Sequence, residues 1–79
     1  MKVQVKLMAT LRNKLPPEAR GLAQIDLEPG ATVAVLLDRL GIAASQVHAV
    51  MVNDAAEPDR QRPLADGDSL LLLPPVAGG

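Results

Sequence analysis

The sequence predicts a small α+β domain, a mixed sheet of four to five strands with one main helix packed on one face, and three observations lead to this class. Residues 2–8 alternate between polar and apolar side chains, which is typical of a strand with one buried face. Residues 33–40 have the periodicity of an amphipathic helix. Residues 69–73 form a second strand-like run, which Pro74 and Pro75 end. Because the helix lies between the first and last strands in the sequence, these strands are predicted to pair in parallel.

The first part of the chain is predicted to form two strands joined by a loop. The odd-numbered apolar side chains of residues 2–8 would share the buried face of the first strand. Residues 12–17 are mostly polar and end in two prolines, which indicates a loop or a short broken turn. Residues 23–28 alternate again and predict the second strand, which Pro29 and Gly30 end.

The helix is predicted over residues 33–40. Thr32, directly before it, is a good N-cap residue. Apolar residues at positions i, i+3, i+4 and i+7 make one apolar stripe, which would face the sheet. Gly41 supplies the left-handed conformation that ends a helix, and Ile42 beyond it would contact Leu37 as in a Schellman cap.

The second part of the chain is predicted to contribute the remaining strands. Residues 47–52 read as the third strand, and residues 53–54 as the turn that follows it. Residues 55–62 are polar and contain a proline, so we predict that they are irregular. Residues 66–67 form another predicted turn, directly before the last strand.

The tail of the sequence, Pro-Pro-Val-Ala-Gly-Gly, is the segment that no folding argument explains. Two prolines in series hold the backbone extended, and the four residues after them could reach about 13 Å from the body at roughly 3.3 Å per residue. Two glycines could thread a slot too narrow for a Cβ atom. We therefore predict a domain over residues 1–73 and an extended tail over residues 74–79. A frayed terminus is the alternative. The tail residues predicted to bind a partner protein are Pro74, Pro75, Val76, Ala77, Gly78 and Gly79.

The last strand is apolar on both of its faces. Leu70 and Leu72 are predicted to face the core. Leu71 and Leu73 then lie on the sheet face away from the helix, where Met51 of the third strand joins them by the same parity. Since one helix covers only one face, the second cover would come from another protein, and we predict that Met51, Leu71 and Leu73 form a docking patch. A central strand that is simply covered on both sides is the alternative.

Composition argues against several functions. The net charge of −1 and the absence of Phe, Tyr and Trp give no basis for binding nucleic acid or an anionic membrane. The absence of cysteine removes thiolate metal sites and an internal thiol nucleophile, and no metal site is predicted. No apolar leader follows Met1 and no apolar run could span a bilayer, so we expect a cytoplasmic protein.

Single polar residues are better explained by structure than by chemistry. His48 is the only histidine, and without a cysteine beside it a structural role is favoured over that of a general base. Asp66 and Asp68 flank Gly67 without the spacing of a calcium loop, which is ordinary turn chemistry.

Over nearly its whole length the chain resembles the MoaD/ThiS-type ubiquitin-like sulfur carriers. Residues 2–12 are similar to the first strand of that family, residues 30–37 to the start of its helix, and residues 52–53 to the end of its third strand. The most specific match is Leu-Ala-Asp-Gly-Asp at residues 64–68 together with the tail of residues 74–79. These segments resemble in particular the branch that forms the small subunit of molybdopterin synthase.

The resemblance implies the β-grasp fold and a reacting role for the Gly79 carboxylate. A partner adenylating enzyme, similar to ubiquitin-activating enzymes, would consume ATP to activate Gly79. A sulfur donor of the desulfurase or rhodanese type would then convert it to a thiocarboxylate. The tail would deliver this sulfur to the large subunit of molybdopterin synthase, so the chain would have no catalysis of its own and no bound cofactor. Two alternatives stay open: a sulfur carrier for thiamine, cysteine or tungsten-cofactor synthesis, and a ubiquitin-like protein modifier or β-grasp interaction module.

Overall fold

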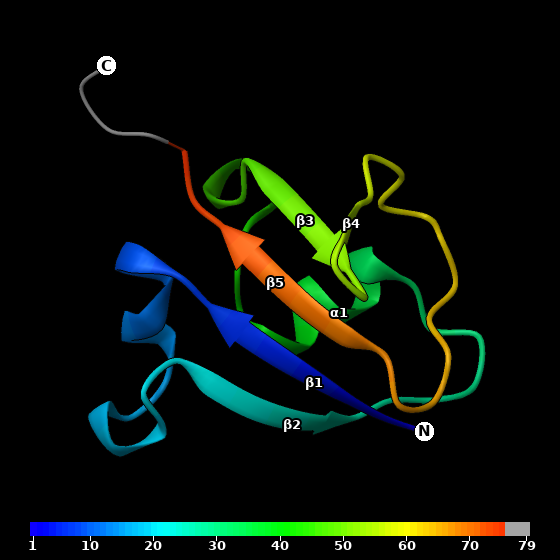
Figure 1. Ribbon diagram of the computed structural model, residues 1–79, viewed down its shortest axis with the longest axis horizontal. Coiled ribbons are helices and arrows are strands. Elements are labelled where there is room, and N and C mark those ends of the chain that lie inside the picture. The colour runs from blue at the N-terminus through cyan, green and yellow to red at the C-terminus, as the bar shows by residue number, and fades with distance from the viewer. Residues whose placement is uncertain (76–79) are drawn as a thin grey trace.

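The computed structural model describes residues 1–75, and it contains one sheet and one α-helix in that part of the chain (Figure 1). The strands are β1 (Lys2–Leu7), β2 (Leu22–Asp26), β3 (Ala49–Val52), β4 (Ala55–Ala56) and β5 (Ser69–Leu73). The helix is α1 (Val33–Leu40), and three short 3₁₀ helices are η1 (Ala9–Lys14), η2 (Pro17–Ala19) and η3 (Ala44–Gln46). The predicted α+β class is confirmed.

The sheet is mixed, with the strand order β2-β1-β5-β3-β4. The central strand β5 pairs in parallel with β1 and antiparallel with β3, and β1 pairs antiparallel with β2. The predicted parallel pairing of the first and last strands is therefore confirmed, with Val5 opposite Leu70 and Leu7 opposite Leu72.

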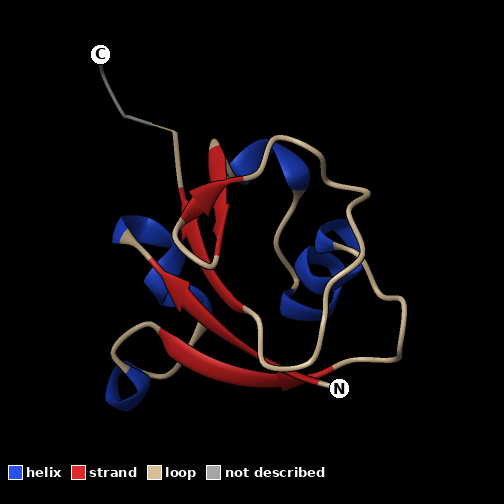
Figure 2. Ribbon diagram, turned by 45° about the vertical axis from the view of Figure 1, so that its right-hand side comes forward, coloured by secondary structure: helices blue, strands red, loops and turns tan. Residues whose placement is uncertain are grey.

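The core lies between the sheet and α1, which form two layers (Figure 2). In β1 the odd-numbered side chains are buried and the even-numbered ones exposed, as their alternation predicts. The largest fully buried side chains come from β1, α1 and β5, and they are Val3, Val5, Leu7, Val33, Leu36, Leu70 and Leu72.

The helix has the bounds and both caps that its sequence predicts. Thr32 Oγ1 accepts a hydrogen bond from the Val35 amide at 3.3 Å. At the other end Gly41 has φ 73° and ψ 29°, which is the left-handed conformation. The Gly41 amide donates to the Asp38 carbonyl at 3.1 Å and the Ile42 amide donates to the Leu37 carbonyl at 2.9 Å, which makes a Schellman cap.

The prediction that residues 55–62 are wholly irregular is wrong. Asn53 and Asp54 both have positive φ, 51° and 69°, and this two-residue turn returns the chain alongside β3. Ala55 and Ala56 then pair with Val52 and Met51 as the short strand β4. The third strand begins at Ala49, separated from the end of η3 by two residues, and it is therefore shorter than the predicted 47–52.

Two strand boundaries also differ from the sequence prediction: β1 ends at Leu7 instead of residue 8, and β2 spans Leu22–Asp26 instead of residues 23–28. Residues 9–14 form a 3₁₀ helix, and Leu11 of this helix is buried in the core. No helix within residues 1–75 is long and apolar enough to cross a membrane.

Candidate functional site

The central strand β5 carries the chain out of the middle of the sheet (Figure 1). Its last residues are held on both sides: the Leu73 carbonyl accepts from the His48 amide at 2.7 Å, and the Leu72 carbonyl accepts from the Met8 amide at 3.1 Å. Pro74 after the strand is half-buried and Pro75 is exposed. The point at which the tail leaves the domain is therefore fixed by hydrogen bonds to neighbouring segments. Four predicted tail residues lie outside the described part of the chain: Val76, Ala77, Gly78 and Gly79.

The predicted docking patch, Met51, Leu71 and Leu73, lies on the sheet face opposite α1. All three side chains are half-buried, whereas Leu70 and Leu72 are only 2% and 0% exposed on the core side. The predicted parity of β5 is therefore correct. Met51 is the Cα partner of Leu71 in the ladder between β3 and β5, which makes these two side chains direct neighbours. What binds this patch stays a prediction.

A shallow hollow of about 310 Å³ adjoins the patch on the same face. The residues that line it come from β1 and the residue after it, from β3 and the turn that follows it, and from β5, and they are Lys6, Met8, Met51, Asp54, Ser69, Leu70 and Leu71. Sequence reasoning did not include Lys6, Met8 or Asp54 in the site. The alternation of residues 2–8 could have found Lys6 and Met8, because the even-numbered residues of β1 face away from the core and Met8 continues the same alternation. Asp54 depended on the hairpin to β4, which was not predicted.

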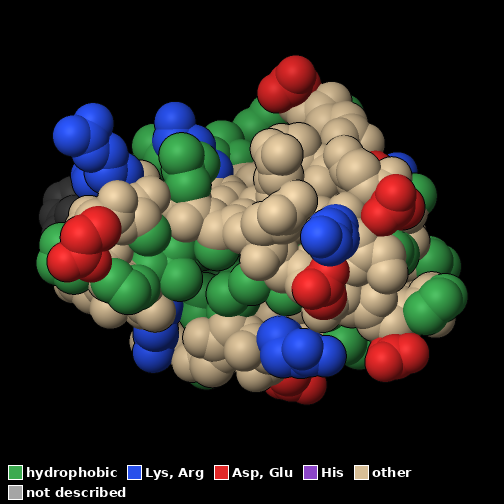
Figure 3. All heavy atoms as spheres, turned by 90° about the horizontal axis from the view of Figure 1, so that it is seen from below, with side chains coloured by type: hydrophobic (Ala, Val, Ile, Leu, Met, Phe, Trp, Pro, Cys, Tyr) green, Lys and Arg blue, Asp and Glu red, His purple; other side chains and the backbone are tan. Residues whose placement is uncertain are grey.

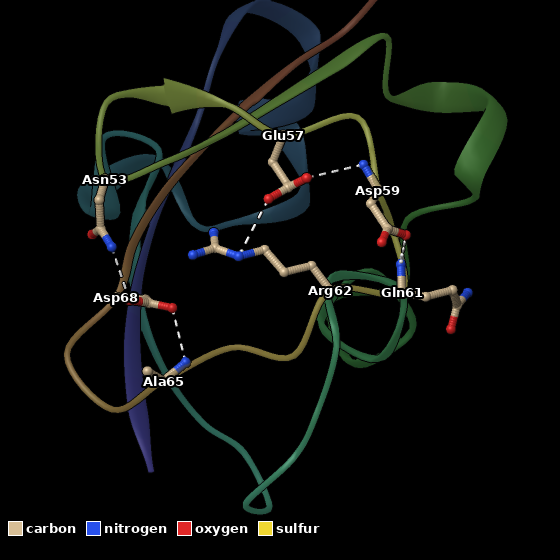
Figure 4. Close-up of polar contacts among 7 residues, drawn as sticks. All are labelled: Asn53, Glu57, Asp59, Gln61, Arg62, Ala65 and Asp68. Carbon is tan, nitrogen blue, oxygen red and sulfur yellow. Dashed lines mark hydrogen bonds and ion pairs between the residues drawn. The ribbon is translucent and has the colours of Figure 1, made fainter.

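The start of β5 is positioned by a polar network around Asp68 (Figure 4). Asp68 is only 8% exposed; its Oδ1 accepts from Asn53 Nδ2 at 2.9 Å, and its Oδ2 accepts from the Ala65 amide at 2.8 Å. Asn53 Oδ1 in turn accepts from the Ser69 amide at 3.0 Å. The hydrogen bond from the Ala65 amide, followed by that from Asn53, lowers the pKa of the Asp68 carboxyl below its ordinary value of 3.8. This network joins the β3–β4 turn to β5 and gives Asp68 a structural role.

The remaining polar candidates also make structural contacts. Asp66 Oδ1 accepts from the Lys2 amide at 2.7 Å, and His48 is exposed at the surface. Arg62 Nε lies 3.2 Å from Glu57 Oε1 in the loop after β4 (Figure 4). Across residues 1–75, no group of three or more His, Cys, Asp or Glu side chains is placed to hold a metal ion.

A mixed five-stranded sheet, one main helix on one face and a tail that leaves from the central strand define a ubiquitin-like β-grasp protein. The sequence matches the family model of the ThiS family over residues 5–79. The chain therefore belongs to the ThiS family, that is, to the MoaD/ThiS-type sulfur carriers. A comparison with curated proteins gives no match.

Solved structures agree with this assignment. The small archaeal modifier protein SAMP1 from Haloferax volcanii is 26% identical, with both chains covered over 100% of their length and a TM-score of 0.76. A chain in the complex of subunits 1 and 2 of molybdopterin-converting factor from Helicobacter pylori is 27% identical, with both chains covered over 100% and a TM-score of 0.61. A putative molybdopterin-converting factor subunit 1 from Pyrococcus furiosus shares the fold, with a TM-score of 0.73, 24% identity and coverage of 95% of this chain and 98% of that one. Together with the family match, these likenesses fit a ThiS/MoaD-like sulfur carrier or a ubiquitin-like modifier.

Proposed function

We propose that this protein is a sulfur carrier in molybdopterin synthesis, in which the Gly79 carboxylate is converted to a thiocarboxylate. The observation that carries the proposal is the match to the ThiS family, which extends through the Gly-Gly end of the tail. The likeness to a chain of the Helicobacter pylori complex supports the molybdopterin branch. The partner of this protein would then correspond to subunit 2 of such a complex, which is the large subunit of molybdopterin synthase.

The chemistry proceeds on the carboxylate and on partner enzymes. An oxygen of the Gly79 carboxylate attacks the α-phosphorus of ATP in an adenylating enzyme, pyrophosphate leaves, and an acyl-adenylate forms. The terminal sulfur of a persulfide on a donor of the desulfurase or rhodanese type then attacks the acyl carbon, and AMP leaves. A thiol of a partner enzyme reduces the resulting acyl disulfide, which releases the thiocarboxylate and leaves a disulfide on the partner. The sulfur must come from a partner because the sequence has no cysteine. The protein itself supplies the acyl group and the surface by which the partners hold it.

The transfer to the pterin takes place in the large subunit. The thiocarboxylate sulfur attacks a carbon of the pterin precursor there and displaces an oxygen leaving group. Water then hydrolyses the resulting thioester, which leaves the sulfur on the pterin and restores the Gly79 carboxylate. A second loaded carrier supplies the second sulfur of the dithiolene. The tail starts from the end of β5, which hydrogen bonds hold in place. A partner that docks on Met51, Leu71 and Leu73 would therefore receive Gly79 at a distance set by the length of the tail.

The proposal is tested by intact-mass measurement after incubation with an adenylating enzyme, ATP and a sulfur donor. We expect a mass increase of one oxygen-to-sulfur exchange, which fragmentation assigns to Gly79, and no increase when ATP is omitted. The loaded protein, mixed with the large subunit and the pterin precursor, should then return to the carboxylate as the dithiolene forms. Loading without any transfer to this acceptor would favour thiamine, cysteine or tungsten-cofactor synthesis instead.

A ubiquitin-like modifier is the second candidate, and the likeness to the modifier SAMP1 favours it. In that case a lysine amine of another protein attacks the acyl-adenylate, AMP leaves, and an isopeptide bond to Gly79 forms. Fragment masses that contain Gly79 joined to a lysine of another protein would identify this outcome. A carboxylate that stays unmodified with every activating enzyme tested would leave a β-grasp interaction module.

A further inference from the structure

The sheet has one long edge that no other segment of residues 1–75 pairs with, and this edge is β2 (Figure 1). The opposite edge is β4, which has only two residues and so offers little backbone to another chain. The strand β2 has five residues, and its register with β1 runs from Leu22 to Asp26 without a bulge. It contains neither Pro nor Lys, which commonly protect such edges.

The backbone groups on the outer side of β2 belong to alternate residues. The Met1 and Leu27 backbones exchange hydrogen bonds at 2.8 Å in both directions, and the Leu7 amide donates to the Gly21 carbonyl at 2.7 Å. Hydrogen-bonded pairs recur at every second position of an antiparallel ladder. The amides and carbonyls of the intervening residues therefore point away from the sheet, and these residues are Leu22, Gln24 and Asp26.

Apolar side chains flank this edge on both faces. On the outer face Leu22 is 57% exposed, the largest exposure of any large apolar side chain in residues 1–75. On the helix side Ala23 and Ile25 are half-buried, and Ile25 packs against the core cluster. A strand added to this edge would cover both sets of side chains.

The charges carried by residues 20–28, that is, by β2 and the residues directly beside it in the sequence, are separated by sign. Lys6 and Arg20 lie at the end where β2 begins, and Asp26 and Glu28 lie at the end where it finishes, with Lys2 of β1 beside Asp26. Figure 3 views the molecule from the side of β2, and it shows Lys and Arg side chains on both sides of this face while most Asp and Glu side chains lie on the right. An added strand of the same sequence in parallel would place like charges together, whereas an antiparallel one places opposite charges together.

We propose that β2 pairs with β2 of a second copy of this chain, antiparallel and about a two-fold axis, so that one continuous sheet spans the dimer. The register is centred on Gln24, because only that register pairs all three outward-facing residues: Leu22 with Asp26 of the second copy, and Gln24 with itself. Ala23 then lies opposite Ile25 on the helix side, and the Arg20 end of one copy meets the Glu28 end of the other. This proposal does not depend on the sulfur-carrier function, because the patch of Met51, Leu71 and Leu73 belongs to β3 and β5 and stays open.

The test is sedimentation equilibrium of the full chain across a roughly hundredfold range of protein concentration, since association appears only through mass action. An edge-to-edge contact buries less surface than a standard interface, so we expect a dimer that dissociates on dilution. The weight-average mass should rise from that of one chain toward twice that value. Over the same range, amide hydrogen exchange of Leu22, Gln24 and Asp26 should slow as concentration increases.

Two sets of variants identify the edge and the direction of pairing. Gln24→Pro removes the central outward amide at a position where an edge tolerates proline, and should remain monomeric, whereas Gln24→Val keeps that amide and should associate as before. Arg20→Glu and Glu28→Arg should each reduce association, and the double variant should restore it because the opposite charges again meet across the axis.

Three results would overturn the proposal. The first is a constant single-chain mass with unchanged exchange at these three amides. The second is association that Gln24→Pro leaves intact. The third is protection of the β2 amides that appears only when another protein is added, which would assign the edge to an extended segment of that protein.

Discussion

Met51 of β3 and Leu71 of β5 are Cα partners in an antiparallel ladder, and both side chains lie on the sheet face opposite α1. Their half-buried state contrasts with Leu70 and Leu72 on the same strand, which are 2% and 0% exposed. Substitutions of odd-numbered residues of β5 therefore test the outer surface of the sheet, and substitutions of even-numbered residues test the core.

We predict that Leu71→Asp weakens binding to the adenylating enzyme and to the large subunit by about 2 kcal/mol or more, because a central apolar contact of a docking patch is lost. Isothermal titration calorimetry with each partner measures this loss. The free protein should keep its circular dichroism spectrum and most of its stability. Unfolding of the free Leu71→Asp variant would show that Leu71 belongs to the core.

Leu72→Ala is the matched control for the patch. This side chain is 0% exposed, so its truncation should lower the free energy of unfolding by about 2–5 kcal/mol. Where the variant still folds, binding to the partners should be close to that of the unmodified protein. The opposite result, normal stability with lost binding, would contradict the assignment of the two faces.

The elements with strong local signals were predictable from sequence. The alternation of residues 2–8, the apolar stripe and caps of residues 33–40, and the parity of residues 69–73 each depend on the side chains of the segment itself, and each is confirmed. The patch followed from the same parity. A strand such as β4 has no such signal, because two alanines carry no alternation and their pairing depends on the turn before them.

Contacts between distant segments were beyond local patterns. Asn53 and Asp68 are each typical turn residues in the sequence. Only the fold brings the two turns together, so that the side-chain amide of Asn53 donates a hydrogen bond to the carboxylate of Asp68. The hollow that Leu71 lines likewise combines residues of β1, β5 and β3 with the β3–β4 turn, and β1 is far from the other segments in sequence. Its polar members Lys6 and Asp54 carry no pattern that joins them before the strand order is known.

We predict that Asp68→Asn lowers the free energy of unfolding at neutral pH by about 1–3 kcal/mol, because one of two hydrogen-bond acceptors is replaced by a donor. The pKa of Asp68 in the folded protein lies below its ordinary value of 3.8. Between these two pKa values the carboxyl therefore binds more protons in the unfolded chain than in the folded protein. The stabilisation is therefore fully present above pH 3.8 and is lost as the pH falls through the folded pKa. Urea unfolding from neutral to acidic pH should show a flatter acid limb in the variant.

Asp54→Asn is the control for this pH dependence. Asp54 is exposed in the β3–β4 turn with φ 69°, a conformation that Asn also tolerates, so the charge is removed without loss of an acceptor in the Asp68 network. Its acid limb should match that of the unmodified protein. An equal flattening in both variants would mean that the effect comes from general charge and not from Asp68.

We predict that replacing Pro74 and Pro75 with Gly slows sulfur transfer while stability changes little. Each Pro restricts the backbone, and freeing both positions adds an ordering cost of about 1–2 kcal/mol when a partner selects one conformation. The expected effect is a higher KM for the carrier in the synthase reaction. Replacing both with Ala should have a smaller effect, and an unchanged KM in the Gly variant would show that the stiff spacer is incidental.

The position of the Gly79 carboxylate is the decisive variable for the proposed function. We predict that adding one residue after Gly79, or deleting Gly79, lowers sulfur loading by at least about a hundredfold, because reacting atoms must lie near 3–3.5 Å and one residue shifts the carboxylate by about 3.3 Å. Gly78→Ala should be impaired less, since it adds one methyl group within the partner's slot. Intact mass spectrometry measures loading, and it also shows whether the added residue is retained. The extended variant should still bind its partners through Met51, Leu71 and Leu73, which separates docking from chemistry. If the untrimmed extended variant delivers sulfur at the normal rate, the carrier function is wrong, and a β-grasp interaction module explains the fold and the patch instead.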